Sequence, residues 1–243
     1  MEEVVERPEL PCADGGPNSP RSPVAPLSDG RERPILFSAP MVRALLDGRK
    51  TQTRRIIKRT ALEWLEEGFT PEFVAEPGNA AICPFGKPGD RLWVREAWSA
   101  EWSWRHEKPR DIIPAAPIWY WADGDPAERD WTRPKPSIHM PRWASRITLE
   151  VTEVRVERLQ DISEADATAE GSKEPSLVPI IGACWSERDA YAKLWEHING
   201  PGSWDANPWV WAVSFKVITP DQSVGRESDD AAPERTTGPG SAA

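Results

Sequence analysis

Apolar and polar positions in the first part of the chain predict a strand, a helix and a second strand. Residues 34–37 suit a short strand, and the apolar spacing over 39–46 is typical of a helix. Ser38 stands where a helix N-cap belongs, and Gly48 stands just beyond the helix, where a left-handed residue commonly ends it. The β-branched residues within 51–57 then predict a strand, so a tight turn joins the two elements.

The middle of the chain predicts an insertion and two further strands. Residues 58–86 form a mixed segment that we interpret as an insertion containing a short helix. Turn residues at 87–90 lead into alternation over 91–96, which predicts a strand. Residues 145–159 are the clearest β segment, and their alternation slips by one position near 152–153. Such a slip indicates a β-bulge or a strand that bends around a small barrel.

The last part of the chain predicts two helices and a late strand. A capping pattern within 161–166 opens one helix, and Ser186 with Asp189 repeats the device before a second helix. Residues 209–217 alternate, with very bulky side chains on one face, which predicts a strand. Several non-adjacent strands with few short helices predict an α+β fold: a small, partly closed β-barrel of mixed or antiparallel strands flanked by short helices.

Composition divides the 243 residues into a folded part and two polar ends. Residues 1–33 and 220–243 are rich in Pro, Gly, Ser and acids. We expect both to be disordered, because they cannot bury enough apolar surface to offset the entropy of ordering. The expected domain is 34–219, with insertions at about 58–86 and 99–140. The net charge of −9 argues against non-specific binding to long duplexes, which needs an extended basic face.

The sequence contains no pattern of metal ligands and no apolar membrane segment. Its three cysteines and three histidines are too widely spaced for a disulfide framework or a metal site, so we expect no metal and no cofactor. No apolar run approaches the length of a membrane span, and the acidic N-terminus lacks the layout of a signal peptide. These patterns predict a cytoplasmic protein that does not contact membranes.

The turn between the first helix and the second strand carries a strong local positive charge. Between Met41 and Arg59 the chain has one acid, Asp47, and seven bases: Arg43, Arg49, Lys50, Arg54, Arg55, Lys58 and Arg59. Thr53 has a hydroxyl that becomes a nucleophile when a base removes its proton, and Lys50 lies three residues before it. A lysine beside arginines in a partly desolvated cleft tends toward a lowered pKa, which suits a base. A solvated basic turn without chemistry is the alternative.

A tryptophan-rich segment, residues 99–136, has two interpretations. Its five tryptophans are Trp102, Trp104, Trp119, Trp121 and Trp131. Interleaved with charged residues, they would form a stacking surface for bases. We favour the second interpretation, an excursion that buries its own indoles as a small satellite core, because acids are as frequent there as bases.

The basic turn and three other segments carry a resemblance to a known family. The run Gly48-Arg49-Lys50-Thr51-Gln52-Thr53-Arg54-Arg55 resembles the signature of ASCH domains, which have a PUA-like β-barrel fold. Residues 87–94 resemble the family's Gly-Asp turn and next strand, and 159–171 resemble its strand-to-helix passage ending in Glu. With the terminal strand, the resemblance spans residues 34 to about 217. The sequence of this core most resembles ASCH proteins carried by phages and prophages.

The resemblance implies a cleft between barrel and helices that holds a nucleotide, a modified nucleoside or RNA. Some small bacterial members with a similar turn hydrolyse the amide of N(4)-acetylcytidine, using a Lys, a Thr and a later Glu. By motif, these catalytic residues correspond to Lys50, Thr53 and Glu170. Further candidates for contact with phosphate or a base are Arg43, Arg49, Arg54 and Arg55. Glu96, at the end of a predicted strand, is a second candidate carboxylate. Trp93 and Trp98 flank Glu96 and are candidates to stack a base, but we favour core packing for an inward Trp in a barrel.

Three other functions stay open on the sequence. A non-catalytic RNA or nucleotide reader would use the same cleft as an open groove continuous with the arginines of the turn, with salt-dependent affinity. A ribonuclease acting on single-stranded RNA would use Lys50 and a carboxylate as acid and base at a 2′-hydroxyl. A phage accessory protein would bind a host protein through the Trp-rich segment. The observation that separates them is whether Lys50, Thr53 and Glu170 meet in one pocket.

Overall fold

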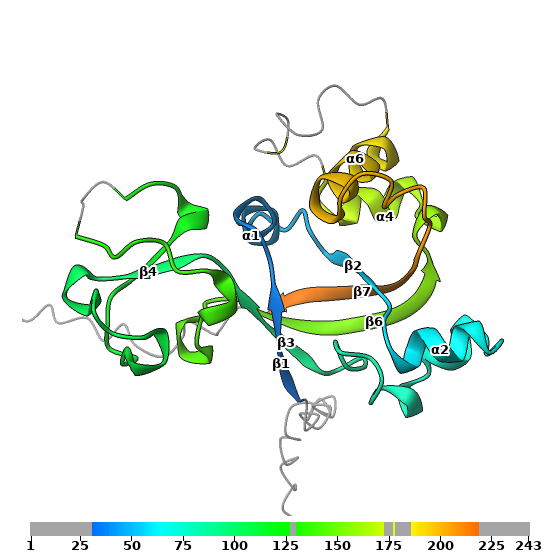
Figure 1. The fold of residues 1–243 in the computed structure, drawn as a ribbon, viewed down its shortest axis with the longest axis horizontal. Helices are drawn as coiled ribbons and strands as arrows, with labels where there is room; N and C mark the ends of the chain where they lie inside the picture. The colour runs from blue at the N-terminus through cyan, green and yellow to red at the C-terminus, as the bar shows by residue number, and fades with distance from the viewer. Residues whose placement is uncertain (1–30, 127–129, 173–176, 178–185, 219–243) are drawn as a thin grey trace, which may run out of the picture.

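The structure of the protein is a computed structural model in which residues 31–126, 130–172, 177 and 186–218 are described (Figure 1). Its main sheet has five strands in the spatial order β1-β3-β6-β7-β2. These strands are β1 (Glu32–Leu36), β2 (Gln52–Ile56), β3 (Arg91–Arg95), β6 (Thr148–Arg158) and β7 (Trp209–Ile218). Helices pack around this sheet, so the predicted α+β class is confirmed.

The sheet is mixed and its two edges are connected by a side chain. β1 and β3 run parallel, whereas the other neighbours are antiparallel. The register of β6 against β7 shifts between Val151 and Glu153, which confirms the predicted slip. In the described part of the chain β1 and β2 are unpaired edge strands, so no closed barrel is present there. Arg55 Nη2 bridges the edges by donating to the Leu36 carbonyl oxygen at 2.9 Å.

The helices begin where the sequence predicts, with one difference in capping. The hydroxyls of Ser163 and Ser186 each accept a backbone N–H at 3.0 Å and cap two of them, as predicted. Ser38 precedes the first helix, but its side chain makes no capping hydrogen bond, which corrects its predicted role. The α-helices are α1 (Ala39–Leu46), α2 (Thr60–Glu66), α3 (Pro71–Ala75), α4 (Glu164–Ala169) and α6 (Glu187–Asn199). Short 3₁₀ helices are η1 (Pro77–Asn79), η2 (Trp102–Trp104), η3 (Pro109–Asp111), η4 (Trp121–Asp123), η5 (Ser137–His139), η6 (Arg142–Ala144) and η7 (Leu159–Asp161).

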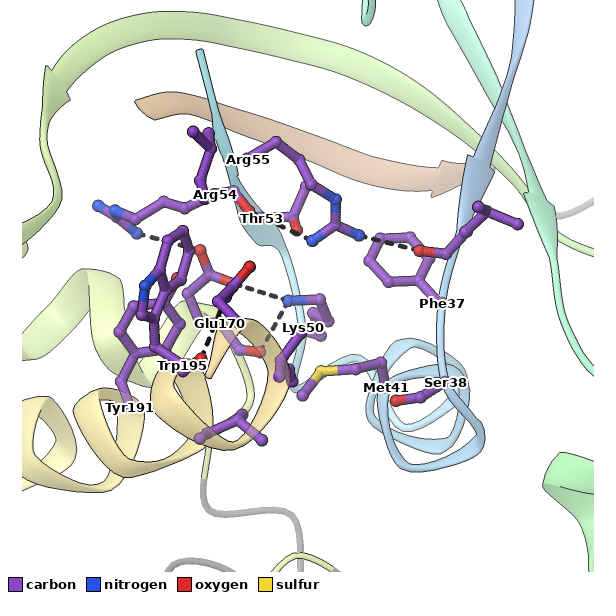
Figure 2. Close-up of a pocket in the computed structure, with 15 residues that line it drawn as sticks. Phe37, Ser38, Met41, Lys50, Thr53, Arg54, Arg55, Glu170, Tyr191 and Trp195 are labelled. Atoms are coloured by element: carbon purple, nitrogen blue, oxygen red, sulfur yellow. Dashed lines mark hydrogen bonds and ion pairs between the residues drawn. The ribbon is translucent and has the colours of Figure 1, made fainter. Parts of the chain in front are cut away.

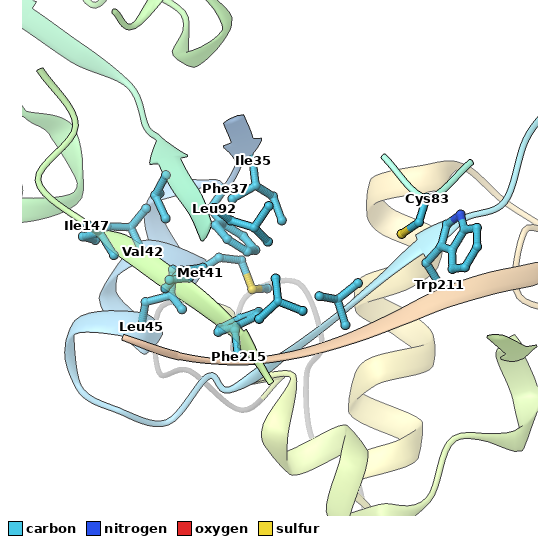
Figure 3. Packing of buried hydrophobic residues seen from close by; sticks show 14 of the residues in the cluster. Ile35, Phe37, Met41, Val42, Leu45, Cys83, Leu92, Ile147, Trp211 and Phe215 are labelled. Atoms are coloured by element: carbon cyan, nitrogen blue, oxygen red, sulfur yellow. The ribbon is translucent and has the colours of Figure 1, made fainter. Parts of the chain in front are cut away.

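The main core lies between the sheet and α1. Figure 3 shows Met41 and Leu45 of α1 directed toward Phe215 of β7, and all three side chains are buried. The other face of β7 contributes Val210 to a separate buried cluster with Tyr191 of α6 and Ala167 of α4. Both faces of β7 are therefore covered, and alternate residues of this strand belong to two different cores. The second core packs α4 and α6 against the sheet beside β2.

The Trp-rich insertion forms its own small unit. Its strands β4 (Trp98–Ala100) and β5 (Ile118–Tyr120) pair with each other and not with the main sheet. A second apolar cluster contains the fully buried Trp98 together with Ile112 and Met140. A satellite core is therefore present, as the preferred interpretation predicted, but its buried indole is Trp98. The five indoles of residues 99–136 are not fully buried, and half of the surface of Trp102 is exposed.

Several expected boundaries can now be placed. β1 begins at Glu32, so the fold starts two residues before the expected boundary at residue 34. Apart from residues 31–33, the tails expected to be disordered, 1–33 and 220–243, lie outside the described residues. None of the described helices is both long and apolar enough to span a membrane. Within the same residues, no three His, Cys, Asp or Glu side chains gather as ligands for a metal ion.

Candidate functional site

The turn between α1 and β2 is built so that Lys50 enters the protein. Gly48 adopts φ of 70°, the left-handed conformation that ends α1 with little strain. The Ala44 carbonyl oxygen then accepts the N–H groups of both Arg49 and Lys50 at 2.9 Å. These two hydrogen bonds to one carbonyl oxygen turn the chain toward the protein interior, and Lys50 is only 2% exposed.

Lys50 donates three hydrogen bonds, and Figure 2 shows the two that Glu170 accepts. Its Nζ lies 2.8 Å from the Gln52 carbonyl oxygen, 2.8 Å from the Glu170 carbonyl oxygen and 2.8 Å from Glu170 Oε2. Lys50 and Glu170, two of the three residues assigned by motif, are therefore paired across 120 residues of sequence. Three acceptors match the three hydrogens of an ammonium group.

Arg54 occupies the other side of the same carboxylate. Its Nη1 donates to Glu170 Oε1 at 3.2 Å and to Gln52 Oε1 at 2.6 Å, while Nε donates to Glu157 Oε1 at 2.8 Å. Asp166 Oδ2 lies 3.3 Å from Nη2. Arg54 is 1% exposed, so this residue, predicted to bind ligand, is committed to a buried ionic network.

Burial sets the charge state of the site. It lowers the pKa of Lys50, and the pull of Glu170 in the opposite direction does not cancel this effect. Burial also lowers the pKa of Arg55. The pKa of Tyr191 is raised well above its ordinary value, first by burial and then by the charge of Glu170. The site therefore favours a neutral tyrosine and disfavours additional positive charge.

The free edge of β2 adds backbone groups to the site. Positions 51 and 57, at the two ends of the strand, exchange hydrogen bonds with β7. Because N–H directions alternate along a strand, the N–H groups of Arg54 and Ile56 point to the open edge. The Arg54 carbonyl, which shares this direction, accepts from Arg55 Nη1 at 3.2 Å.

A cavity of about 330 Å³ lies beside this edge. Phe37, Tyr191 and Trp195 supply aromatic walls, and Lys50, Thr53 and Glu170 all contribute to its lining (Figure 2). Thr53 Oγ1 is buried and, among the described residues, has no hydrogen-bond partner. A buried hydroxyl without a hydrogen-bond partner costs free energy, and a ligand that bonded to Thr53 Oγ1 would recover that cost.

Gly171, which follows Glu170, brings the carboxylate to the turn. Its φ is 71°, and an added Cβ would lie 3.1 Å from Ala44 Cβ and 3.3 Å from Lys50 Cβ. Gly171→Ala is therefore expected to lower the free energy of unfolding by at least about 1 kcal/mol more than Gly48→Ala. Gly48 has nearly the same φ, 70°, but nothing near its missing Cβ. Urea titration measures both, and equal losses would show that contact with Lys50 is unimportant.

Two of the arginines predicted to contact ligand, Arg43 and Arg49, lie outside the cavity lining. Arg43 Nη1 donates to the Ala122 carbonyl oxygen at 3.0 Å, which attaches α1 to the insertion. Arg49 pairs with Asp47 on the surface at 2.7 Å. Arg55 does line the cavity, as predicted.

Trp93, Glu96 and Trp98 do not line this cavity either, so the structure does not bring these three candidates together with Lys50 and Thr53. Trp93 stacks with Arg95, whose guanidinium lies 4.4 Å from the ring centre. Glu96 forms a two-pronged pair with Arg146 at 2.9 and 3.1 Å and is buried. Trp98 belongs to the satellite core. The physical reason is topology: β3 continues away from β2 into the insertion.

Sequence reasoning missed the aromatic walls and two acids. Tyr191 and Trp195 are four residues apart on α6, so they share a helix face, and that spacing was an available signal. Glu157 and Asp166 carried no local signal, because they meet Arg54 only after β6 and α4 have packed.

Comparison with known proteins gives no family assignment. No protein-family model, no curated protein and no solved structure matches this chain. Conclusions about function therefore rest on the residues of the site and on their chemistry.

Proposed function

We propose that the cavity beside β2 binds a cytidine-like nucleoside with an acylated exocyclic amine and hydrolyses its amide, as the resemblance to ASCH domains implies. The observation that carries the proposal is the unpartnered Thr53 hydroxyl in a cavity that also contains the Lys50–Glu170 pair. On this proposal the open sheet belongs to a PUA-like barrel whose gap between β1 and β2 is the ligand entrance.

Size and lining support a nucleoside ligand. A cavity of about 330 Å³ falls within the range of small-molecule sites, and its three aromatic side chains suit a planar base. The edge N–H groups of Arg54 and Ile56 supply donors at the wall. A pyrimidine offers ring nitrogen and carbonyl acceptors that match such donors.

The proposed reaction uses Thr53 as nucleophile and Lys50 as base. Thr53 Oγ attacks the acyl carbon while its proton passes to the neutral amine of Lys50. The carbon–nitrogen bond then breaks, and Lys50 returns the proton to the leaving amine. Water next cleaves the acyl–Thr53 ester, which releases a carboxylic acid and restores the hydroxyl. The N–H of Arg54 is the proposed donor to the negative oxygen.

For this role Lys50 has to give up one of its three acceptors. A neutral amine has two hydrogens, whereas Nζ donates three hydrogen bonds in the structure. The lowered pKa of Lys50 supports access to the neutral form, since burial disfavours its charge.

A non-catalytic nucleoside-binding module is the second candidate, and two observations favour it. The three acceptors around Lys50 suit a structural ammonium, and Thr53 has no exposed surface until neighbouring side chains shift. A reader of long RNA has less support, because Arg54 is buried in ion pairs and cannot line an open basic groove.

Turnover of acylated cytidine tests the proposed function. Purified protein incubated with N(4)-acetylcytidine is expected to release cytidine, and chromatography measures the amount released. Because the neutral amine is the base, kcat is expected to rise with pH to a plateau, with an apparent pKa below the ordinary lysine value of about 10.4.

Lys50→Met is the matched variant, because it keeps the length of the side chain and leaves Glu170 paired with Arg54. It is expected to lose turnover and the pH dependence. Wild-type protein that binds the nucleoside without releasing cytidine would instead establish the binding module. If the protein neither bound these nucleosides nor released cytidine from them, with several acyl groups tried, the proposal would be overturned.

A further inference from the structure

The insertion contains a second cavity, separate from the one beside β2. Its volume is about 280 Å³, and its lining residues are Trp102, Arg105, His106, Thr132, Arg133 and Lys135. Three of these six are basic, one is histidine, and none is acidic. This is unusual in a chain whose net charge is −9, because acids outnumber bases overall.

The backbone holds this cavity in place from two segments. Trp98 and Lys135 exchange backbone hydrogen bonds at 3.3 and 2.7 Å, so the segment with Arg133 lies alongside β4. The Thr132 N–H donates to the Ala100 carbonyl oxygen at 2.8 Å. Buried Thr132 also accepts the Ala100 N–H on its hydroxyl at 3.2 Å. The basic side chains therefore project from an ordered frame.

Among the described residues, no acid forms an ion pair with the basic side chains of this cavity. In the described part of the chain, the side chains of Arg133 and Lys135 make no ion pair or hydrogen bond. The guanidinium of Arg105 lies 5.3 Å from the Trp102 ring centre, and its Nη1 donates to the Trp102 carbonyl oxygen at 3.3 Å. Positive groups placed together repel each other, and a bound anion removes that repulsion.

An exposed indole beside these charges identifies the kind of anion. Trp102 is 50% exposed, whereas the other four indoles of residues 99–136 are all partly buried. A half-exposed ring offers a stacking face for a base, and adjacent basic groups contact phosphates. An acidic peptide would use the charges but not the indole.

We propose that this cavity binds a short stretch of single-stranded nucleic acid. A base stacks on Trp102, and successive phosphates contact Arg105, Arg133 and Lys135. The proposal is independent of the cavity beside β2, since the two cavities share no lining residue. The protein would then hold a strand on its insertion whether or not it hydrolyses a nucleoside.

Fluorescence anisotropy with a labelled ten-nucleotide oligouridine tests this site in the full chain. Wild-type protein is expected to bind, with affinity that falls as salt rises. The double variant R133Q/K135Q is expected to reduce the slope of log affinity against log salt by about 1.4, because each phosphate contact to a single strand contributes about 0.7. Trp102→Ala is expected to weaken binding roughly tenfold through lost stacking.

The matched control is K108Q/R110Q, which removes the same charge from exposed positions of the insertion outside the cavity lining. It is expected to leave the slope unchanged. Equal losses in both double variants would show general attraction to the strand and overturn the site. Absence of wild-type binding, or displacement by equimolar uridine monophosphate, would also overturn it. Thr53→Val is expected to bind the oligonucleotide like wild type, which separates this result from the nucleoside assay.

Discussion

Glu170→Ala is expected to lower the free energy of unfolding by about 3–5 kcal/mol. The carboxylate accepts from Lys50 at 2.8 Å and from Arg54 at 3.2 Å, and all three side chains are buried. Its removal leaves two buried cations short of a partner, and replacing the lost acceptors with water requires the site to open. Urea denaturation followed by tryptophan fluorescence measures the loss.

Glu150→Ala is the comparison for this result. Glu150 pairs with Lys216 at 3.0 Å on the surface, so its removal is expected to cost at most about 1 kcal/mol. Glu170→Gln keeps an acceptor oxygen, so its loss in the free energy of unfolding is expected to lie between those of Glu150→Ala and Glu170→Ala. Similar losses for Glu150→Ala and Glu170→Ala would contradict a buried network that holds α4 to the basic turn.

Thr53→Val is expected to abolish turnover of the acylated nucleoside while raising the free energy of unfolding by about 1 kcal/mol. Valine has nearly the same shape, suits a strand and removes a buried hydroxyl that has no partner among the described residues. A residue retained at a cost in stability is the signature of a functional position. Chromatographic release of cytidine and thermal unfolding test the two effects together.

Thr132→Val provides the opposite case. The hydroxyl of Thr132 is also buried but accepts the Ala100 N–H at 3.2 Å. Its replacement is expected to lower the free energy of unfolding by about 1–3 kcal/mol, because the donor is then left unpaired. If Thr53→Val were equally destabilising, or if it kept full turnover while Thr53→Ser lost it, a nucleophilic role for Thr53 would be wrong.

Local sequence determined most of the elements around the site. The end of α1 at Gly48, the turn into β2, both serine caps and the bulge of β6 all depend on residues within a few positions of each other. Such features follow from backbone conformational preference and side-chain alternation. They predict that Lys50 lies in the turn and Thr53 in the strand that follows it. Glu170 was added to these candidate site residues by the resemblance to ASCH domains.

Only the tertiary structure decided how these residues are used. Arg54 looked like a ligand-binding cation, but packing of β6 and α4 surrounds it with Glu157 and Asp166. Glu96 looked like a second site carboxylate, but β3 carries it to Arg146. The openness of the sheet between β1 and β2 likewise depends on pairing of distant strands. A charge has no fixed role in the sequence, because its role depends on which distant groups share its low-dielectric surroundings.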